Sequence, residues 1–341
     1  MTTRREFLIQ TAGASAGLAL GTQWPRDAAA QASLAERNKQ VVLGYKAAAK
    51  TRPMAAIQSE FFSANYKRLR GGLQNLANNA EGQGFPDNGE YLRGAIPDRN
   101  DVVEEIVAEG DMVGMLWRVT GTHRGPLFGI PPTGKAINFY EAGIFKLAEG
   151  KIVEAWFLGD EAGLLKQLGA KIPARKDGRM IVPPVTNAGE DPDAALKRIE
   201  AGDLSKAENR NRLIVARSKG SARPPAGDRA ADFKQLRFGF QHMRDFGIAN
   251  GTVKQSITEA LPDRRDRIDG FLAEGNKVWM MFKVSGTQSA PLYGVAPTNR
   301  RVELPEIGIM TFADGQWKQA WYFGDELGMM LQLDALHMLQ T

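Results

Sequence analysis

The side chains that could do chemistry in this sequence are carboxylates rather than thiols or metal ligands. The 341-residue chain has no cysteine and three histidines, His123, His242 and His337, none of which lies at metal-ligand spacing from another. This excludes disulfides and a cysteine nucleophile, and it predicts no metal centre and no cofactor. Glu141 and Glu306 stand out because each lies in a strand-like run with apolar neighbours. If they point inward they could bind substrate, whereas outward alternation is the default along a strand.

The second half of the sequence repeats the first. Residues 95–168 align without a gap on residues 260–333, at a constant offset of 165, and about 31 of the 74 pairs are identical. Such self-similarity indicates a duplicated segment. With a chain length typical of about two domains, it predicts domains at 33–172 and 193–341, joined by a proline-rich linker at 173–192.

Each repeat is expected to place helices before strands. Apolar residues at helical spacing predict an amphipathic helix over 34–45, and residues 193–217 are expected to be helical at the start of the second repeat. Glycine-containing turns at 148–150 and 313–315 are typical of tight hairpins between the last two strands of each repeat. The expected strands are 112–120, 136–147 and 151–158 in the first repeat, and 277–285, 301–312 and 316–323 in the second.

Two tryptophans occupy equivalent positions on the last expected strand of each repeat. Trp156 follows Ala155, and Trp321 follows Ala320. They could line a cavity and stack on an aromatic ligand as substrate-binding residues. The alternative is packing in a core, where large aromatic side chains are commonly buried.

Two stretches of the first repeat carry a family resemblance. Residues 121–135 read GTHRGPLFGIPPTGK, and residues 160–169 read DEAGLLKQLG. Together they resemble the signature of the SnoaL-like polyketide cyclase (ester cyclase) family. The resemblance implies a nuclear-transport-factor-2-like fold of the α+β class. The expected architecture is two tandem cone-shaped α+β barrels, each a bent antiparallel sheet wrapped around helices. It also implies pairing through the sheets, either within one chain as a pseudo-dimer or between chains as a homo-oligomer.

The resemblance implies chemistry by an acidic residue without metal or cofactor. Members of the family close rings by intramolecular aldol condensation, and Asp160 occupies the position of their acid/base, with Asp325 in its place in the second repeat. A carboxylate inside an apolar cone suits this role, because desolvation raises its pKa. The alternative for both aspartates is a helix N-cap. His123 is implied as a polar partner of the substrate, the alternative being a surface residue, and Gln288 replaces it in the second repeat.

The N-terminus resembles a twin-arginine export signal. Arg4 and Arg5 precede Phe7 and Leu8, a mildly apolar stretch follows, and Ala30-Gln31-Ala32 fits a peptidase site before Ser33. We therefore expect residues 1–32 to be a signal peptide read by the twin-arginine translocation machinery, and the mature protein to be periplasmic or extracellular. The alternative is an amphipathic helix. The apolar stretch is too short to span a membrane.

Composition and charge leave two classes of function open. The formal net charge of +5 comes from 44 basic and 39 acidic residues that are mixed along the chain, a pattern that disfavours nucleic-acid binding. One hypothesis is a cofactor-independent cyclase or isomerase acting on a small hydrophobic carbonyl compound. The other is a non-catalytic module that binds a small ligand or a protein, since one fold can host both.

Overall fold

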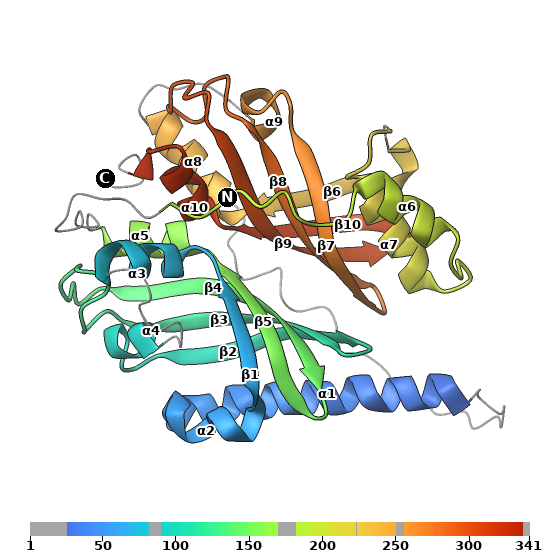
Figure 1. The fold of residues 1–341 in the computed structure, drawn as a ribbon, viewed down its shortest axis with the longest axis horizontal. Helices are drawn as coiled ribbons and strands as arrows, with labels where there is room; N and C mark the ends of the chain where they lie inside the picture. The colour runs from blue at the N-terminus through green and yellow to red at the C-terminus, as the bar shows by residue number, and fades with distance from the viewer. Residues whose placement is uncertain (1–25, 82–89, 170–181, 223, 250–255, 337–341) are drawn as a thin grey trace.

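The computed structural model describes residues 26–81, 90–169, 182–222, 224–249 and 256–336. Most of the expected signal peptide, the first part of the linker and His337 lie outside these residues. Within them the chain forms two tandem α+β domains, each built on a five-stranded mixed sheet (Figure 1). The predicted fold class and the internal duplication are confirmed.

The first repeat places five helices and two edge strands around the predicted strands. Its sheet has the order β1-β5-β4-β3-β2, in which β1 runs parallel to β5 and the other pairs are antiparallel. The sheet is therefore mixed, where a purely antiparallel one was expected. The elements are α1 (Arg26–Thr51), α2 (Met54–Phe61), β1 (Phe62–Arg70), α3 (Leu73–Glu81), α4 (Glu90–Ala95), β2 (Asn100–Glu109), β3 (Met112–Thr122), β4 (Ala136–Ala148), β5 (Lys151–Gly159) and α5 (Glu161–Leu168).

The second repeat has the same topology, with sheet order β6-β10-β9-β8-β7. The helical segment expected at its start is confirmed as two helices, α6 and α7. The elements are α6 (Pro192–Glu200), α7 (Ala207–Arg217), a short 3₁₀ turn (Ala226–Asp228), β6 (Arg229–Arg237), α8 (Phe238–Ala249), α9 (Ile257–Ala260), β7 (Arg265–Glu274), β8 (Lys277–Thr287), β9 (Arg301–Ala313), β10 (Gln316–Gly324) and α10 (Glu326–Gln332).

The expected strands and hairpins are confirmed, but each repeat has two strands more than predicted. The missed strands are β1 and β2 in the first repeat and β6 and β7 in the second. At the β4–β5 hairpin, Glu149 and Gly150 both have positive φ, at 52° and 74°, as two-residue hairpin loops of this kind require.

One face of each sheet packs on the helices of its own repeat, and the other faces meet. Trp117 and Phe145 belong to the core between the first sheet and its helices. A separate cluster joins the two sheets and includes Leu116 and Ile144 from the first repeat with Trp279 from the second. Figure 1 shows the second sheet above the first, with α1 and α2 on the far side of the first.

The contacts between the repeats are reciprocal, as in a two-fold dimer. Ala108 donates its backbone N–H to Glu274, and Ala273, its equivalent at offset 165, donates to Glu109; both distances are 2.9 Å. Because equivalent residues exchange equivalent contacts, the two repeats pair as the subunits of a symmetric dimer do. The duplicated sheets thus form a pseudo-dimer within one chain.

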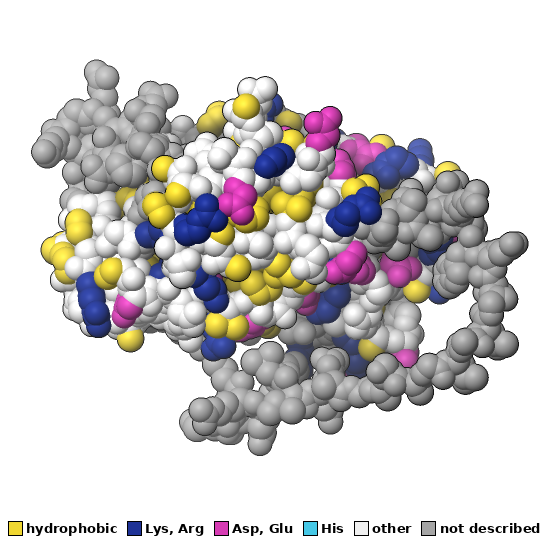
Figure 2. Space-filling view, turned by 90° about the horizontal axis from the view of Figure 1, so that it is seen from below, with side chains coloured by type: hydrophobic (Ala, Val, Ile, Leu, Met, Phe, Trp, Pro, Cys, Tyr) yellow, Lys and Arg dark blue, Asp and Glu magenta, His cyan; other side chains and the backbone are white. Residues whose placement is uncertain are grey.

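The molecular surface carries charges of both signs. On the face that Figure 2 shows, basic and acidic side chains are interspersed, with apolar side chains between them. None of the described helices combines the length and the apolar character that crossing a bilayer requires.

Candidate functional site

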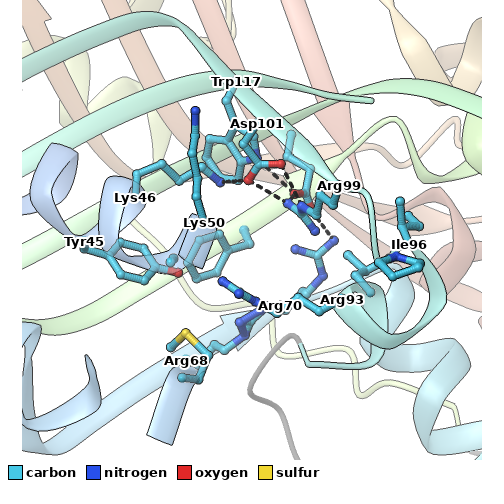
Figure 3. Close-up of a pocket in the computed structure, with 16 residues that line it drawn as sticks. Tyr45, Lys46, Lys50, Arg68, Arg70, Arg93, Ile96, Arg99, Asp101 and Trp117 are labelled. Atoms are coloured by element: carbon cyan, nitrogen blue, oxygen red, sulfur yellow. Dashed lines mark hydrogen bonds and ion pairs between the residues drawn. The ribbon is translucent and has the colours of Figure 1, made fainter. Parts of the chain in front are cut away.

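A cavity of about 140 Å³ opens in the first repeat, between the helices and the inner face of the sheet (Figure 3). Its walls come from α1, α2, β1 to β5, α4 and the turn after α4, so elements across the whole domain shape it. Apolar and charged side chains share these walls. They are Tyr45, Lys46, Ala49, Lys50, Met54, Arg68, Arg70, Leu92, Arg93, Ile96, Pro97, Arg99, Asp101, Trp117, Glu141 and Phe157.

Glu141 is the carboxylate at the centre of this wall. It points inward from β4 and is 1% exposed, against the default of outward alternation. Its carboxylate accepts hydrogen bonds from Arg70 at 2.7 Å, Arg99 at 2.6 Å and the indole N–H of Trp117 at 3.0 Å. Burial raises the pKa of Glu141, but Arg70 and Arg99 outweigh burial and hold it well below its usual range. Glu141 is therefore ionised at neutral pH.

A lysine and an aspartate extend the charge network toward α1. Lys46 pairs with Asp101 at 2.5 Å, and its ammonium lies 3.7 Å from the centroid of the Trp117 ring. Asp101 also accepts hydrogen bonds from Arg99 at 2.7 and 3.1 Å. Burial lowers the pKa of Lys46 to about 8, although Asp101 opposes the shift. Burial thus makes Lys46 easier to deprotonate than an ordinary lysine.

Glu161 belongs to the same network and was missed in the sequence. It is 2% exposed, follows Asp160 at the start of α5, and accepts a hydrogen bond from Arg70 at 2.9 Å. Burial raises its pKa to about 8, against the opposing effect of Arg70. The signal that could have found it is an acid directly after Asp160 that the second repeat retains as Glu326.

The second repeat contains an equivalent network. Glu306 is buried and pairs with Arg237, which occupies the place of Arg70 in the sheet register. Lys219 pairs with Asp266 at 3.1 Å and lies 3.5 Å from the centroid of the Phe282 ring, as Lys46 does with Asp101 and Trp117. The shared members are thus Lys46, Arg70, Arg99, Asp101, Glu141 and Glu161, matched by Lys219, Arg237, Arg264, Asp266, Glu306 and Glu326.

Asp160 and Asp325 are helix N-caps. Asp160 accepts a hydrogen bond from Gly163 N–H, and Asp325 does the same from Gly328, so the capping alternative is confirmed for both. Asp160 also lies 3.0 Å from Nε2 of His242, which belongs to the second repeat. Neither aspartate is among the side chains that line the cavity. Their assignment as acid/base residues stays a prediction.

His123 is buried close to the turn before β4 and away from the cavity wall. Its Nδ1 lies 3.2 Å from the backbone N–H of Thr133, and burial lowers its pKa. Gln288 makes the equivalent contact, accepting from the N–H of Thr298 at 2.6 Å. An amide can thus replace the imidazole in fixing this turn. His123 contacts Thr133 and Asp160 contacts His242, so the structure does not bring His123 and Asp160 together.

The two tryptophans lie between the repeats. Trp156 and Trp321 pack against the cluster that joins the two sheets, whereas Phe157, the next residue along β5, lines the cavity. The alternation of side chains along a strand explains the difference. The core-packing alternative therefore describes these residues.

Among the described residues, no group of three or more His, Asp or Glu side chains is arranged to hold a metal ion. The acidic side chains of the cavity are instead paired with arginine and lysine.

Comparisons relate the chain to known proteins. The family model described as SnoaL-like polyketide cyclase matches residues 41–168 and 249–333. A proposed SnoaL-like polyketide cyclase from Jannaschia sp. CCS1 is 20% identical, with a TM-score of 0.35, over 44% of this chain and 99% of its own. IdmH from Streptomyces antibioticus, a proposed polyketide cyclase, is 26% identical, with a TM-score of 0.33, over 39% of this chain and 99% of its own. No functionally curated protein matches the sequence.

Proposed function

Because the chain belongs to the SnoaL-like polyketide cyclase family, we propose that the cavity of the first repeat performs cofactor-free cyclisation or isomerisation of a small carbonyl compound. One observation carries this proposal. An ionised carboxylate, Glu141, lies in the cavity wall beside the guanidinium groups of Arg70 and Arg99. The carboxylate that would accept a proton, a weak base because these arginines lower its pKa, and the cations that would stabilise the resulting enolate are therefore in one place.

The proposed reaction needs no external reagent. Glu141 accepts the α-proton of the substrate as the C–H bond breaks, and the electron pair passes to the carbonyl oxygen to give an enolate. In a cyclisation the enolate carbon attacks a second carbonyl of the same molecule, a C–C bond forms, and the new alkoxide takes back the proton. Each guanidinium has five N–H donors, so Arg70 and Arg99 can hold Glu141 and still donate to a developing oxyanion.

The expected test uses a keto compound whose α-proton exchange is followed by NMR in D₂O. Replacing Glu141 by Gln is expected to slow exchange by about 100-fold or more, because the proton acceptor is lost. Glu306→Gln is the matched control in the second repeat and is expected to leave the rate unchanged. Unfolding curves of both variants separate lost chemistry from lost folding. An unchanged rate in Glu141→Gln would remove Glu141 from this role, and Asp160→Asn in the same assay tests the other assignment.

Binding without turnover is the second candidate. It is favoured by the three donors that already engage Glu141 and by the position of Asp160 outside the cavity wall. A keto compound that binds in the cavity and shows no enzyme-dependent exchange would support this function over the first.

We also propose that the protein works outside the cytoplasm after twin-arginine export. The support is the sequence pattern around Arg4 and Arg5. Because α1 begins at Arg26, cleavage before Ser33 would shorten this helix and leave the cavity residues Tyr45 and Lys46 in place. Sequencing the N-terminus of protein from a periplasmic fraction is expected to read from Ser33. A protein that retains Met1 and stays in the cytoplasm would contradict the proposal.

A further inference from the structure

The side chains that line the cavity of the first repeat are unequal in charge. Among the described residues of the lining, six are basic and two are acidic, so these carry four more positive than negative groups. Figure 3 shows labelled arginines from β1, α4 and the turn after α4 around the same space. The basic residues are Lys46, Lys50, Arg68, Arg70, Arg93 and Arg99, and the acidic ones are Asp101 and Glu141.

Comparing the two repeats shows which cations of the cavity are present in both. Arg70 pairs with Phe157 in the sheet register, and its equivalent Arg237 pairs with Tyr322, so this cation is kept in both repeats. Two positions before Arg70, Arg68 is replaced by Gln235.

A second cation of the cavity is also specific to the first repeat. Arg93, in α4, falls on Thr258 of α9 at the offset of 165. The same fold therefore forms without either cation. Arg68 and Arg93 are thus specific to the repeat that has the described cavity, where Arg93 also donates to the backbone oxygen of Arg52 at 3.4 Å.

We propose that the cavity of the first repeat binds a small carboxylate, held by Arg68 and Arg93, as the substrate or ligand of this site. This inference names the ligand class of the proposed function and rests on it for the carbonyl group of the ligand. A planar guanidinium donates two parallel N–H groups to a carboxylate, which makes arginine well suited to this ligand. The Arg68 guanidinium lies 4.6 Å from the centroid of the Phe157 ring, which orients it at the cavity wall.

The size of the cavity sets the size of the ligand. Its volume of about 140 Å³ is close to that of a cavity that holds one benzene ring. A short keto acid fits this limit. Its keto group would lie by Glu141 and Arg99, and its carboxylate by Arg68 and Arg93.

The test compares levulinate with methyl levulinate by isothermal titration calorimetry on the full chain. The two compounds share a keto group and differ in charge. Levulinate is expected to bind at least about tenfold more tightly than the ester, because the ester carries no negative charge to pair with the guanidinium groups. Raising the ionic strength is expected to weaken the binding of levulinate more than that of the ester.

Variants assign the effect to the two arginines. Arg68→Gln with Arg93→Thr installs the residues of the second repeat, and this pair is expected to weaken levulinate binding by about tenfold or more and to abolish the preference over the ester. Lys67→Gln removes one positive charge from an exposed neighbour on the same strand, outside the cavity lining, and is expected to change neither.

Each outcome bears on the proposal. Equal affinity for acid and ester, no binding of levulinate, or unchanged levulinate affinity in the Arg68→Gln, Arg93→Thr variant would each overturn it. Exchange of the α-proton keeps the proposed function separate. If levulinate binds through the two arginines but its proton does not exchange, the ligand class holds and the proposed chemistry fails. If the ester alone binds and exchanges, the chemistry holds and the ligand class fails.

Discussion

Replacing Arg70 by methionine is expected to lower the free energy of unfolding by about 3–5 kcal/mol at neutral pH. The Arg70 side chain is 2% exposed and forms ion pairs with two carboxylates that are equally buried, Glu141 and Glu161. Removing the cation leaves the ionised Glu141 with one buried cationic partner fewer and Glu161 without this hydrogen-bond donor. Chemical denaturation measures the loss.

The control for this variant is an ion pair whose side chains are more exposed to solvent. Arg198 forms an ion pair of 2.7 Å with Glu190, but the two side chains are 59% and 34% exposed. Arg198→Met is therefore expected to cost less than about 1 kcal/mol. Equal losses in Arg70→Met and Arg198→Met would contradict the view that burial makes the Arg70 network strong.

The loss in Arg70→Met is also expected to grow with pH. Burial raises the pKa of Glu161 to about 8 in the folded protein. In the unfolded chain the same group has the usual glutamate pKa of about 4.3, so it loses its proton at a lower pH. The stability that this group contributes is complete below that pH and is lost as the pH rises to about 8. Without Arg70 the folded pKa of Glu161 rises further and the decline continues above pH 8. The difference between variant and wild type should therefore be larger at pH 9 than at pH 5, and a constant difference would argue against this pairing.

A loss of at least about 3 kcal/mol is expected from Trp279→Gly, because it opens a cavity between the two sheets. Trp279 is fully buried, and its indole N–H donates to Glu105 of the first repeat at 2.9 Å. Its equivalent at offset 165 is Gly114, and the two residues meet across the interface. A Cβ added at Gly114 would lie 2.9 Å from the Trp279 ring. One small and one large residue thus fill a space that two equal residues would leave empty or overfill.

Exchanging the two residues tests this complementarity. Gly114→Trp alone is expected to destabilise the protein by overpacking, and Trp279→Gly alone by the cavity. The double variant keeps one tryptophan and one glycine, so it should lose less than the sum of the single losses, with a coupling of about 0.5–3 kcal/mol. Rescue should be incomplete, because a tryptophan at position 114 would lack a hydrogen-bond acceptor. Glu105 accepts from the indole of Trp279, but its equivalent in the second repeat is Gly270, which has no side chain. Additive losses in denaturation experiments would count against the interface.

The strands that the sequence predicted are those with apolar inner faces. β3, β4 and β5 carry long runs of buried residues, and so do their equivalents in the second repeat. β1 was missed because Arg68 and Arg70 occupy positions that line the cavity, so the usual signal of apolar alternation is absent. The strand that carries two of the cavity arginines is thus not revealed by apolar alternation.

The candidate site was predictable only in part. Glu141 was found because it lies in an apolar strand, but its partners were not. Glu141 and its equivalent Glu306 are 165 positions apart, whereas Arg70 and Arg237 are 167 apart and Lys46 and Lys219 are 173 apart. A gapless comparison at an offset of 165 that begins at residue 95 therefore cannot show the last two pairs. The contact between Asp160 and His242 joins residues from different repeats, and a local motif holds no information about it.

The caps of α5 and α10 make the two halves of the chain depend on each other. Asp325 accepts hydrogen bonds from the backbone of Gly72 and the side chain of Asn75, both at 2.7 Å, and His242 reaches Asp160 in the opposite direction. Each closing helix thus begins at a residue that also hydrogen-bonds to the other half. A chain divided between residues 182 and 190 would yield two fragments that lack these contacts until they associate. We therefore expect the folding of the two halves to be coupled to their association.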